Sequence, residues 1–315
     1  MRPDHSETPQ LPHEIMQRWN VAPTDYLGGR HNQHWLVQSR GSRLVVRGYS
    51  PETWDDIAYE LEVLRQLAAL GWPVPTLVEP PTHFAGQTWC LFTWLPGAPP
   101  ELADSSKERR ARGRLLAELH ESTALIGDMG QRGGFCRSDD LVGDPELLSL
   151  VQHYERVCPA EGHILRWHLD QARESFERID LNGAETLVLH SDFAPWNLLL
   201  RDERLSGVLD FESTHLNYRV ADFALAWRGD QDEILDGYQE VHKLTDLDWN
   251  LLVPVYWAWM FLGVKKGIRA MTSGALPSPN FDWQIKHLLK HSGLVGQLAP
   301  PYPGRAGNQT GATLE

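Results

Sequence analysis

The chain has 315 residues, 42% of them hydrophobic and 23% charged, which is ordinary globular usage at a length where one core usually gives way to two lobes. Its formal net charge of −13 disfavours nucleic acid as a partner, because an acidic surface repels phosphate backbones, and it fits either general solubility or a cationic substrate. Three widely spaced cysteines predict neither a disulfide framework nor a zinc site. The sequence shows no signal-peptide pattern and no apolar span long enough to cross a membrane, so we expect a cytoplasmic protein without a membrane partner.

The N-terminal third has the pattern of strands with one helix. Residues 1–19 are expected to form an N-terminal arm, because they begin with polar and proline residues. Apolar runs at 35–37 and 44–46 predict two strands around a turn at 40–42. Apolar residues at helical spacing predict a helix over 52–70, which ends before a glycine.

A further strand is predicted over 87–94, and the Pro- and Gly-rich residues 95–100 then predict a linker. Helices dominate beyond it, at 105–122, 144–157, 162–179, 220–272 and 282–294. Short strands interrupt them at 186–189, 197–200 and 206–209. The tail 299–315 is predicted to be disordered. We therefore expect an α+β fold with a small β-rich lobe at 20–94 and a larger helical lobe at 101–298, with ligands bound in a cleft at the linker.

The most informative pattern is His-x-Asp-x-x-x-x-Asn, formed by His190, Asp192 and Asn197, followed by a strand that ends at Asp210. Phosphoryl transfer needs a carboxylate to take the hydroxyl proton, together with amide and carboxylate oxygens to hold Mg²⁺. Asp192, Asn197 and Asp210 can supply these groups if the two strands pair. A structural alternative is a loop salt bridge between His190 and Asp192, with Asn197 capping a turn.

These residues resemble the motifs of the aminoglycoside phosphotransferase and choline kinase-like superfamily, over roughly residues 20–295. The resemblance implies a two-lobed protein kinase-like fold that transfers the γ-phosphate of ATP or GTP to a hydroxyl of a small molecule. It makes Asp192 the catalytic base, with His190 in the same motif, and makes Asn197 and Asp210 the magnesium ligands. Phe211-Glu212 stands where protein kinases have Phe-Gly, which favours a small-molecule kinase.

Two further residues match the family in places where a structural role is expected. Asp222, in an Ala-Asp-Phe-Ala sequence, corresponds to an aspartate that holds the catalytic region together. His120 belongs to a Leu-His pair at the end of a helix, where an interaction with the helix dipole is expected rather than catalysis.

The small lobe is expected to bind the nucleotide. Gly28, Gly29 and Asn32 resemble the phosphate-covering loop, although a Gly-Gly turn is also common without ligands. The first lysine in the chain is Lys107, so Arg47 must take the place of the usual strand lysine or be a solvated strand residue. Its expected partner is Glu60, with Glu62 as the competitor. The predicted hinge under the nucleotide base is formed by Phe92, Thr93 and Trp94.

The alternatives are a catalytically silent nucleotide-binding protein on the same fold, favoured by the missing lysine, and a metal-dependent hydrolase, which lacks a further histidine ligand. The pattern leaves the oligomeric state open. For the acceptor, the sequence favours an aminoglycoside or amino alcohol, because carboxylates precede aromatic residues in one C-terminal region and both groups can bind a cation. A solvated acidic helix followed by a buried helix would give the same pattern. The carboxylates are Asp230, Asp232, Glu233, Asp236, Glu240, Asp246 and Asp248, and the aromatic residues are Trp249, Tyr256, Trp257, Trp259 and Phe261.

Overall fold

The computed structural model describes residues 9–29, 32–50, 56–100, 105–274, 280–290 and 293–303. The chain divides into two compact units. The first unit contains Met1–Leu102, Arg132–Gly134 and Ala194–Thr214, and the second contains Ala103–Gln131, Phe135–Phe193 and His215–Glu315. The division is therefore not the linear one expected from the sequence, because two later segments group with the N-terminal residues.

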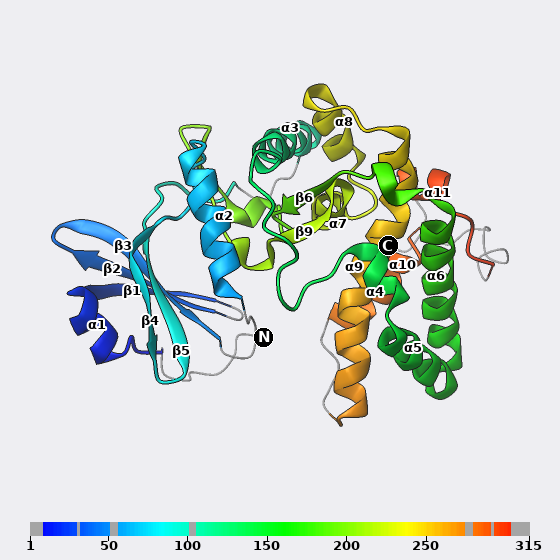
Figure 1. Ribbon diagram of the computed structural model, residues 1–315, viewed down its shortest axis with the longest axis horizontal. Helices are drawn as coiled ribbons and strands as arrows, with labels where there is room; N and C mark the ends of the chain where they lie inside the picture. The colour runs from blue at the N-terminus through cyan, green and yellow to red at the C-terminus, as the bar shows by residue number, and fades with distance from the viewer. Residues whose placement is uncertain are drawn as a thin grey trace, which may run out of the picture. The chain divides into compact units, whose positions relative to one another are not determined.

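The first unit is built on a five-stranded antiparallel sheet with the order β1-β2-β3-β5-β4 (Figure 1). Its strands are β1 (Ala22–Gly28), β2 (Gln33–Ser39), β3 (Ser42–Tyr49), β4 (Leu77–Phe84) and β5 (Gln87–Thr93). The predicted turn is a tight hairpin in which Arg40 and Gly41 both have positive φ, at 50° and 83°. Strand β4 was not predicted, because it contains two prolines. They are tolerated at this edge of the sheet, where the register is irregular.

The N-terminal segment contributes to the core of the first unit, which corrects the prediction of an arm over 1–19. Helix α1 (His13–Trp19) buries Ile15 and Trp19 against the sheet residues Trp35 and Trp89. Ile15 and Trp19, four residues apart, share one face of α1, and Leu11 just before the helix is buried in the same cluster. Residues 1–8 lie outside the described part of the chain.

Helix α2 (Ile57–Ala69) follows the predicted 52–70 pattern, although 51–55 lie outside the described residues. The side chain of Asp56 caps it by accepting a hydrogen bond from the Tyr59 amide. Strands β7 (Leu198–Arg201) and β8 (Arg204–Val208) form a hairpin, as the sequence predicted, and this hairpin bonds to the N-terminal part of the first unit. Ala98 bridges to Leu200, and the Val208 amide donates to the Pro73 carbonyl at 2.8 Å.

The second unit is mainly helical, with one two-stranded ladder of β6 (Thr186–Leu189) and β9 (His215–Tyr218). Its helices are α3 (Ser106–Thr123), α4 (Ser138–Gly143), α5 (Pro145–Val157), α6 (Pro159–Arg178), α7 (Phe223–Trp227), α8 (Asp232–Val241), α9 (Asp246–Thr272), α10 (Asn280–Leu288) and α11 (Gly293–Leu298). The predicted helical segments are thus present, and the Ser105 capping box begins α3. The sheet and helices together give the α+β class expected from the sequence.

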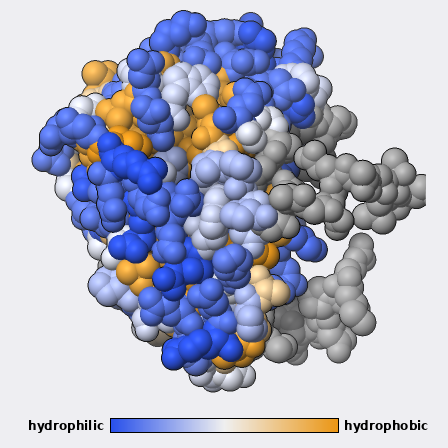
Figure 2. Space-filling model, turned by 90° about the vertical axis from the view of Figure 1, so that its right-hand side faces the viewer, coloured by the Kyte–Doolittle hydropathy of each residue, from blue (hydrophilic) through white to orange (hydrophobic). Residues whose placement is uncertain are grey.

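Helix α9 forms the centre of this unit. Among the described residues it alone has the length and hydropathy of a membrane span, but 72% of its most apolar window is buried inside the structure, as in a core helix. The start of the predicted disordered tail also packs here, because Tyr302 is buried and stacks on His168. The tail prediction is therefore wrong for 299–303, and 304–315 lie outside the described residues. One face of the molecule, shown in Figure 2, is largely hydrophilic with scattered apolar residues.

Candidate active site

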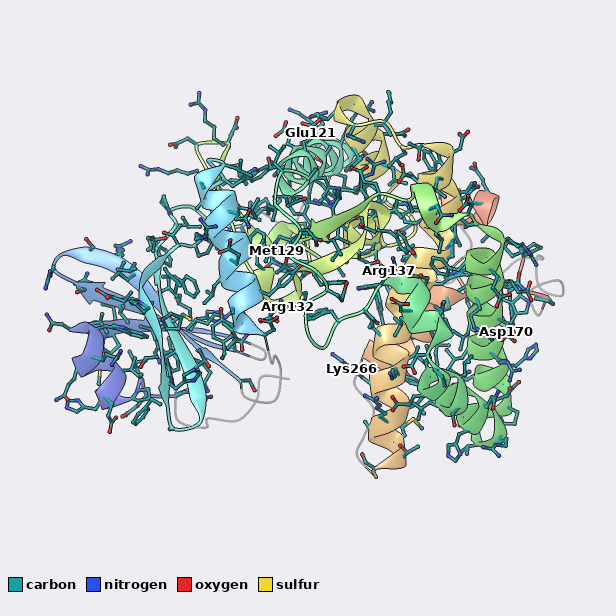
Figure 3. All side chains as sticks on the ribbon, viewed as in Figure 1. Glu121, Met129, Arg132, Arg137, Asp170 and Lys266 are labelled. Atoms are coloured by element: carbon teal, nitrogen blue, oxygen red, sulfur yellow. The ribbon has the colours of Figure 1, made fainter. Side chains whose placement is uncertain are left out.

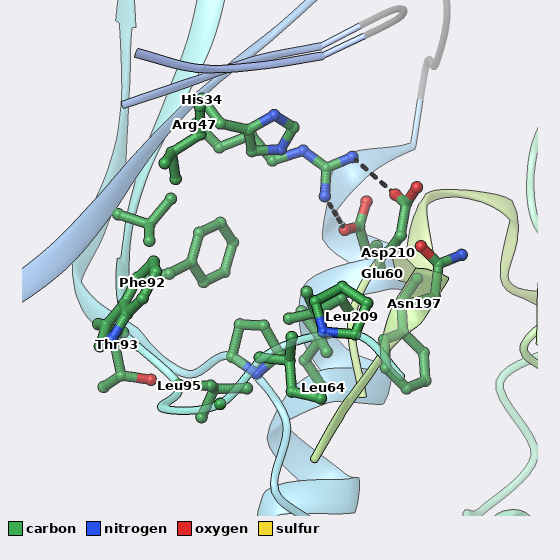
Figure 4. Close-up of a pocket in the computed structure, with 18 residues that line it drawn as sticks. His34, Arg47, Glu60, Leu64, Phe92, Thr93, Leu95, Asn197, Leu209 and Asp210 are labelled. Atoms are coloured by element: carbon green, nitrogen blue, oxygen red, sulfur yellow. Dashed lines mark hydrogen bonds and ion pairs between the residues drawn. The ribbon is translucent and has the colours of Figure 1, made fainter. Parts of the chain in front are cut away.

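A pocket of about 520 Å³ lies within the first unit (Figure 4). One part of its lining is apolar, including Val45 on β3, Leu64 on α2 and Leu209 after β8. A second part is polar and contains Arg47, Glu60, Asn197 and Asp210. The pocket therefore combines an apolar part, which can accept an aromatic base, with a charged end that can accept phosphate.

The three predicted hinge residues, Phe92, Thr93 and Trp94, all line this pocket. The amide of Thr93 donates to the Thr76 carbonyl at 2.9 Å, and its hydroxyl accepts from the Thr76 amide at 3.1 Å. Thr93 is thus held by a neighbouring segment, and its amide already has a partner.

At the charged end, Arg47 and Glu60 form the predicted ion pair, with Nη1 2.9 Å from Oε1. Both side chains are buried, at 7% and 1% exposure. The competitor Glu62 instead faces Arg65, at 2.6 Å. Two further carboxylates lie near Nη2 of Arg47: Glu212 at 2.7 Å and Asp210 at 3.6 Å.

Burial alone would lower the pKa of Arg47, but the surrounding acidic groups, Glu60 first, raise it, so the guanidinium stays charged. Burial raises the pKa of Glu60, against the opposing effect of Arg47. Burial, with a smaller contribution from Arg47, lowers the pKa of His34 to about 4, so this imidazole in the pocket wall is neutral at pH 7. The cation at this end is therefore Arg47.

The predicted phosphate-covering loop follows β1. Gly28 and Gly29 have φ of 84° and 144°, and a Cβ on Gly29 would lie 1.7 Å from the Asn32 carbonyl oxygen, so only glycine fits there. Asn32 is buried, and its Oδ1 accepts from the Ser50 amide at 2.9 Å while its Nδ2 donates to Glu212. Its carboxamide is therefore engaged within the protein. The intervening residues 30 and 31 lie outside the described part.

Asn197 and Asp210 are brought together by the β7–β8 hairpin. The Leu209 amide donates to the Asn197 carbonyl at 2.8 Å, and both Asn197 and Asp210 line the pocket. Strand β8 ends at Val208, and Asp210 two residues later adopts a left-handed conformation, with φ 65° and ψ 61°. An amide oxygen and a carboxylate are ligands that Mg²⁺ accepts when phosphate and water complete its shell, so these two residues fit a magnesium ion.

The segment His190–Asp192 lies in the second unit, directly after β6. Asp222 holds it: the carboxylate accepts from the His190 amide at 2.9 Å, the Ser191 amide at 2.6 Å and Nε2 of His120 at 3.0 Å. The hydrogen bond and charge of His120 lower the pKa of Asp222 although burial opposes them. Asp222 thus holds the backbone of this segment, whereas His120, for which an interaction with the helix dipole was expected, bonds instead to the Asp222 carboxylate and the Tyr238 hydroxyl.

His190 itself is buried, and its Nδ1 accepts a hydrogen bond from the Asp192 amide at 3.2 Å. This ring therefore supports the loop backbone beside Asp192.

A series of hydrogen-bonded polar side chains, which the sequence did not reveal, supports Ser191. His215 lies opposite Leu189 in the β6–β9 ladder, which places its Nδ1 3.2 Å from the Ser191 hydroxyl. Its Nε2 lies 3.3 Å from Nδ2 of Asn217, whose Oδ1 accepts from the Ser138 and Tyr218 amides. Because that amide orientation makes Nε2 an acceptor, Nδ1 carries the proton and donates to Ser191.

Residues 24–249 match the phosphotransferase enzyme family, APH. The chain belongs to this family. It is a small-molecule kinase with a hydroxyl acceptor, as the motif around Asp192 led us to expect.

Relatives and solved structures of the phosphotransferase family agree. The homoserine kinase of Xanthobacter autotrophicus is 27% identical in an alignment of 239 positions that covers 69% of this chain and 70% of the relative. That of Rhodospirillum rubrum is 25% identical over 71% of this chain and 73% of the relative. The aminopropanol kinase associated with a microcompartment has a TM-score of 0.66 at 19% identity, covering 87% of this chain and 93% of that one. A thermostable mutant of an aminoglycoside phosphotransferase, in a ternary complex with ADP and hygromycin B, has a TM-score of 0.61 at 17% identity, covering 87% and 95%. The kinase-like fold prediction is confirmed.

The acidic region that pointed to a cationic acceptor has a different explanation in this phosphotransferase. Six of its seven carboxylates are paired within the second unit: Glu233 contacts Arg109 at 2.8 Å, Glu240 contacts Arg114 at 2.7 Å, and Asp248 contacts Arg219. Asp232 accepts from the Trp227 indole at 2.7 Å, Asp236 lies 4.0 Å from Arg110, and Asp230 pairs with Lys290. Tyr256, Trp257 and Phe261 are buried core residues of α9. The argument from this region to a cationic acceptor is therefore wrong, because these carboxylates join helices.

Proposed function

We propose that this kinase transfers the γ-phosphate of ATP or GTP to a hydroxyl of a small amino alcohol, with Asp192 as the base. The pocket of the first unit is proposed to hold the nucleotide, with its base against Phe92 and the predicted hinge and its phosphates toward Arg47. The observation that carries this proposal is the buried Arg47–Glu60 pair beside Asp210, because it places a fixed cation next to a carboxylate at one end of an apolar pocket.

In the proposed reaction, the acceptor oxygen attacks the γ-phosphorus while its proton passes to the Asp192 carboxylate. The bond between the γ-phosphorus and the bridging oxygen breaks, and the nucleoside diphosphate leaves with that oxygen. Arg47 binds and orients the phosphates. Asn197 and Asp210 would hold Mg²⁺, which when bound offsets the negative charge of the phosphates. His190 and Asp222 position the loop that carries Asp192.

The acceptor class is supported by the homoserine kinases, which are 27% and 25% identical to this chain over about 70% of its length. Homoserine is therefore the first acceptor to test. We also propose that the enzyme works in the cytoplasm, where nucleoside triphosphates are abundant, and that neither nucleic acid nor a membrane is a partner.

A coupled assay of ADP and GDP release tests the proposed function. The purified chain is supplied with ATP or GTP, with and without Mg²⁺, and with homoserine, aminopropanol, choline, hygromycin B and a neutral alcohol. We expect acceptor-dependent, Mg²⁺-dependent release, and we expect Asp210→Ala to weaken the binding of the Mg²⁺ nucleotide in calorimetry. Nucleotide binding without turnover of any acceptor would instead support the catalytically silent alternative.

A further inference from the structure

Glu212 has contacts that its position in the sequence did not predict. Its Oε2 accepts from Nη2 of Arg47 at 2.7 Å and from Nδ2 of Asn32. The Glu212 side chain is 17% exposed and that of Arg47 is 7% exposed, so this pair is shielded from water. Arg47 therefore lies between two carboxylates, with Glu60 on Nη1 and Glu212 on Nη2.

The shape of a guanidinium explains why two carboxylates are needed. Lysine carries a compact charge, whereas arginine presents terminal nitrogens in a rigid fork, and each needs an acceptor when buried. Glu60 satisfies one terminal nitrogen at 2.9 Å and Glu212 satisfies the other at 2.7 Å. A glycine at position 212, as in the Phe-Gly of protein kinases, would remove the second acceptor.

Glu212 is itself held in place from its backbone. Arg132, labelled in Figure 3, donates from Nη1 to the Glu212 carbonyl at 2.8 Å and to the Thr214 carbonyl at 2.9 Å. Its Nε donates to the Asp56 carbonyl at 3.1 Å, at the start of the helix that carries Glu60. Arg132 thus joins the backbone segments that carry the two carboxylates on Arg47.

The side chain of Glu212 also links two strands. Asn32, which precedes β2, donates to Glu212 and accepts from the Ser50 amide, which follows β3. Glu212 therefore ties the end of the glycine turn to Arg47. Glu60, Asp210 and Glu212 carry three formal negative charges near the one positive charge of Arg47. This excess of negative charge favours a nucleotide that carries a divalent cation over a free nucleotide.

We propose that Glu212 is a positioning residue for the nucleotide: it holds the Arg47 fork against Glu60 and so allows arginine to serve where protein kinases have lysine. This inference rests on the proposed function of the pocket. It makes residues 47 and 212 a matched pair, so that the effect of changing one depends on the identity of the other.

A double-mutant cycle on the full chain tests this pairing, with the affinity for Mg²⁺–ATP measured by calorimetry. Glu212→Gln is expected to weaken binding about tenfold, and less than about threefold when Arg47→Lys is already present. Glu62→Gln is the matched control, because Glu62 lies on α2 near Glu60 but pairs with Arg65 instead of Arg47. This variant should leave binding unchanged. Thermal unfolding of each variant verifies that it is folded.

Equal losses in the two backgrounds would overturn the proposal, as would unchanged binding in Glu212→Gln. If Glu212 instead bound the metal, Glu212→Gln would weaken nucleotide binding equally in both backgrounds, and a high Mg²⁺ concentration would restore the affinity. If Glu212→Gln does not fold, a second comparison decides: Arg47→Lys with Glu212→Gly should bind Mg²⁺–ATP within about threefold of Arg47→Lys alone, and a loss of about tenfold would overturn the pairing. A wild-type chain that binds no nucleotide would instead refute the proposed function of the pocket.

Discussion

Asp222 supports the loop before Asp192, and replacing it with asparagine isolates that support. The substitution preserves the shape of the side chain but exchanges one acceptor oxygen for an NH₂ group. The carboxylate now accepts from two backbone amides, of His190 and Ser191, and from His120. In Asp222→Asn, one buried donor must face another donor, and the charge that strengthens the remaining hydrogen bonds is lost.

The magnitude follows from the contacts. Leaving a buried donor without an acceptor costs about 1–3 kcal/mol, and the lost charge weakens the other hydrogen bonds by about 1 kcal/mol. We therefore expect Asp222→Asn to lower the free energy of unfolding by about 3 kcal/mol, or roughly 6 °C in Tm at 2 °C per kcal/mol. The pKa of Asp222 is lowered in the folded state, so this stabilisation is present above the unfolded pKa near 3.9 and is lost as the pH falls through the folded value.

Thermal and urea unfolding followed by circular dichroism measure this effect. Asp170→Asn is the matched control, because Asp170, labelled in Figure 3, forms only an exposed pair with Arg166 on the same helix. It should change stability by less than about 0.5 kcal/mol. A loss below about 1 kcal/mol in Asp222→Asn, or one equal to that of the control, would refute the reasoning.

Three further results are expected. The pKa of His34 is about 4 in the folded state and near 6.5 in the unfolded state, so the unfolded state binds a proton here at a higher pH. Lowering the pH from 6.5 to 4 should therefore reduce the free energy of unfolding by at most about 3 kcal/mol. His34→Gln should flatten the measured dependence of Tm on pH over this range. Gly113→Ala should cost at least about 2 kcal/mol in urea unfolding, because the new Cβ would lie 2.0 Å from the Ile234 carbonyl oxygen; a stability equal to wild type would contradict the close helix contact. His215→Ala should lower kcat about tenfold with little change in nucleotide affinity, because it releases Ser191 beside the proposed base; an unchanged kcat would remove this support from the account.

The parts of the site that the sequence predicted are those encoded by local spacing. Asn197 directly precedes β7 and Asp210 closely follows β8, so the predicted hairpin alone brings these two metal-binding candidates together. The Arg47–Glu60 pair was also predicted, because the resemblance to kinases implies a strand cation paired with a helix glutamate. Glu62 was a real alternative, and the helix face decided between the two glutamates.

The parts that the sequence missed depend on contacts over long intervals. Glu212 meets Arg47 across 165 positions, and Arg132 meets the Glu212 carbonyl across 80, so no local pattern distinguishes these residues from solvated ones. The acidic residues of α8 illustrate the reverse error. Their spacing fits a substrate surface as well as it fits a helix interface, and only the arginines of α3 reveal which one is present.

The central claim is that this chain forms a phosphate ester on a small-molecule hydroxyl, with Asp192 taking the proton. Phosphorus NMR of the complete reaction, with Mg²⁺–ATP and the acceptor that performs best in the release assay, tests it most directly. The account predicts a new phosphomonoester signal that grows as ADP forms, and a rate at least about 10²-fold lower for Asp192→Asn with nucleotide binding retained. Inorganic phosphate as the only product, or an Asp192→Asn variant as fast as wild type, would contradict it.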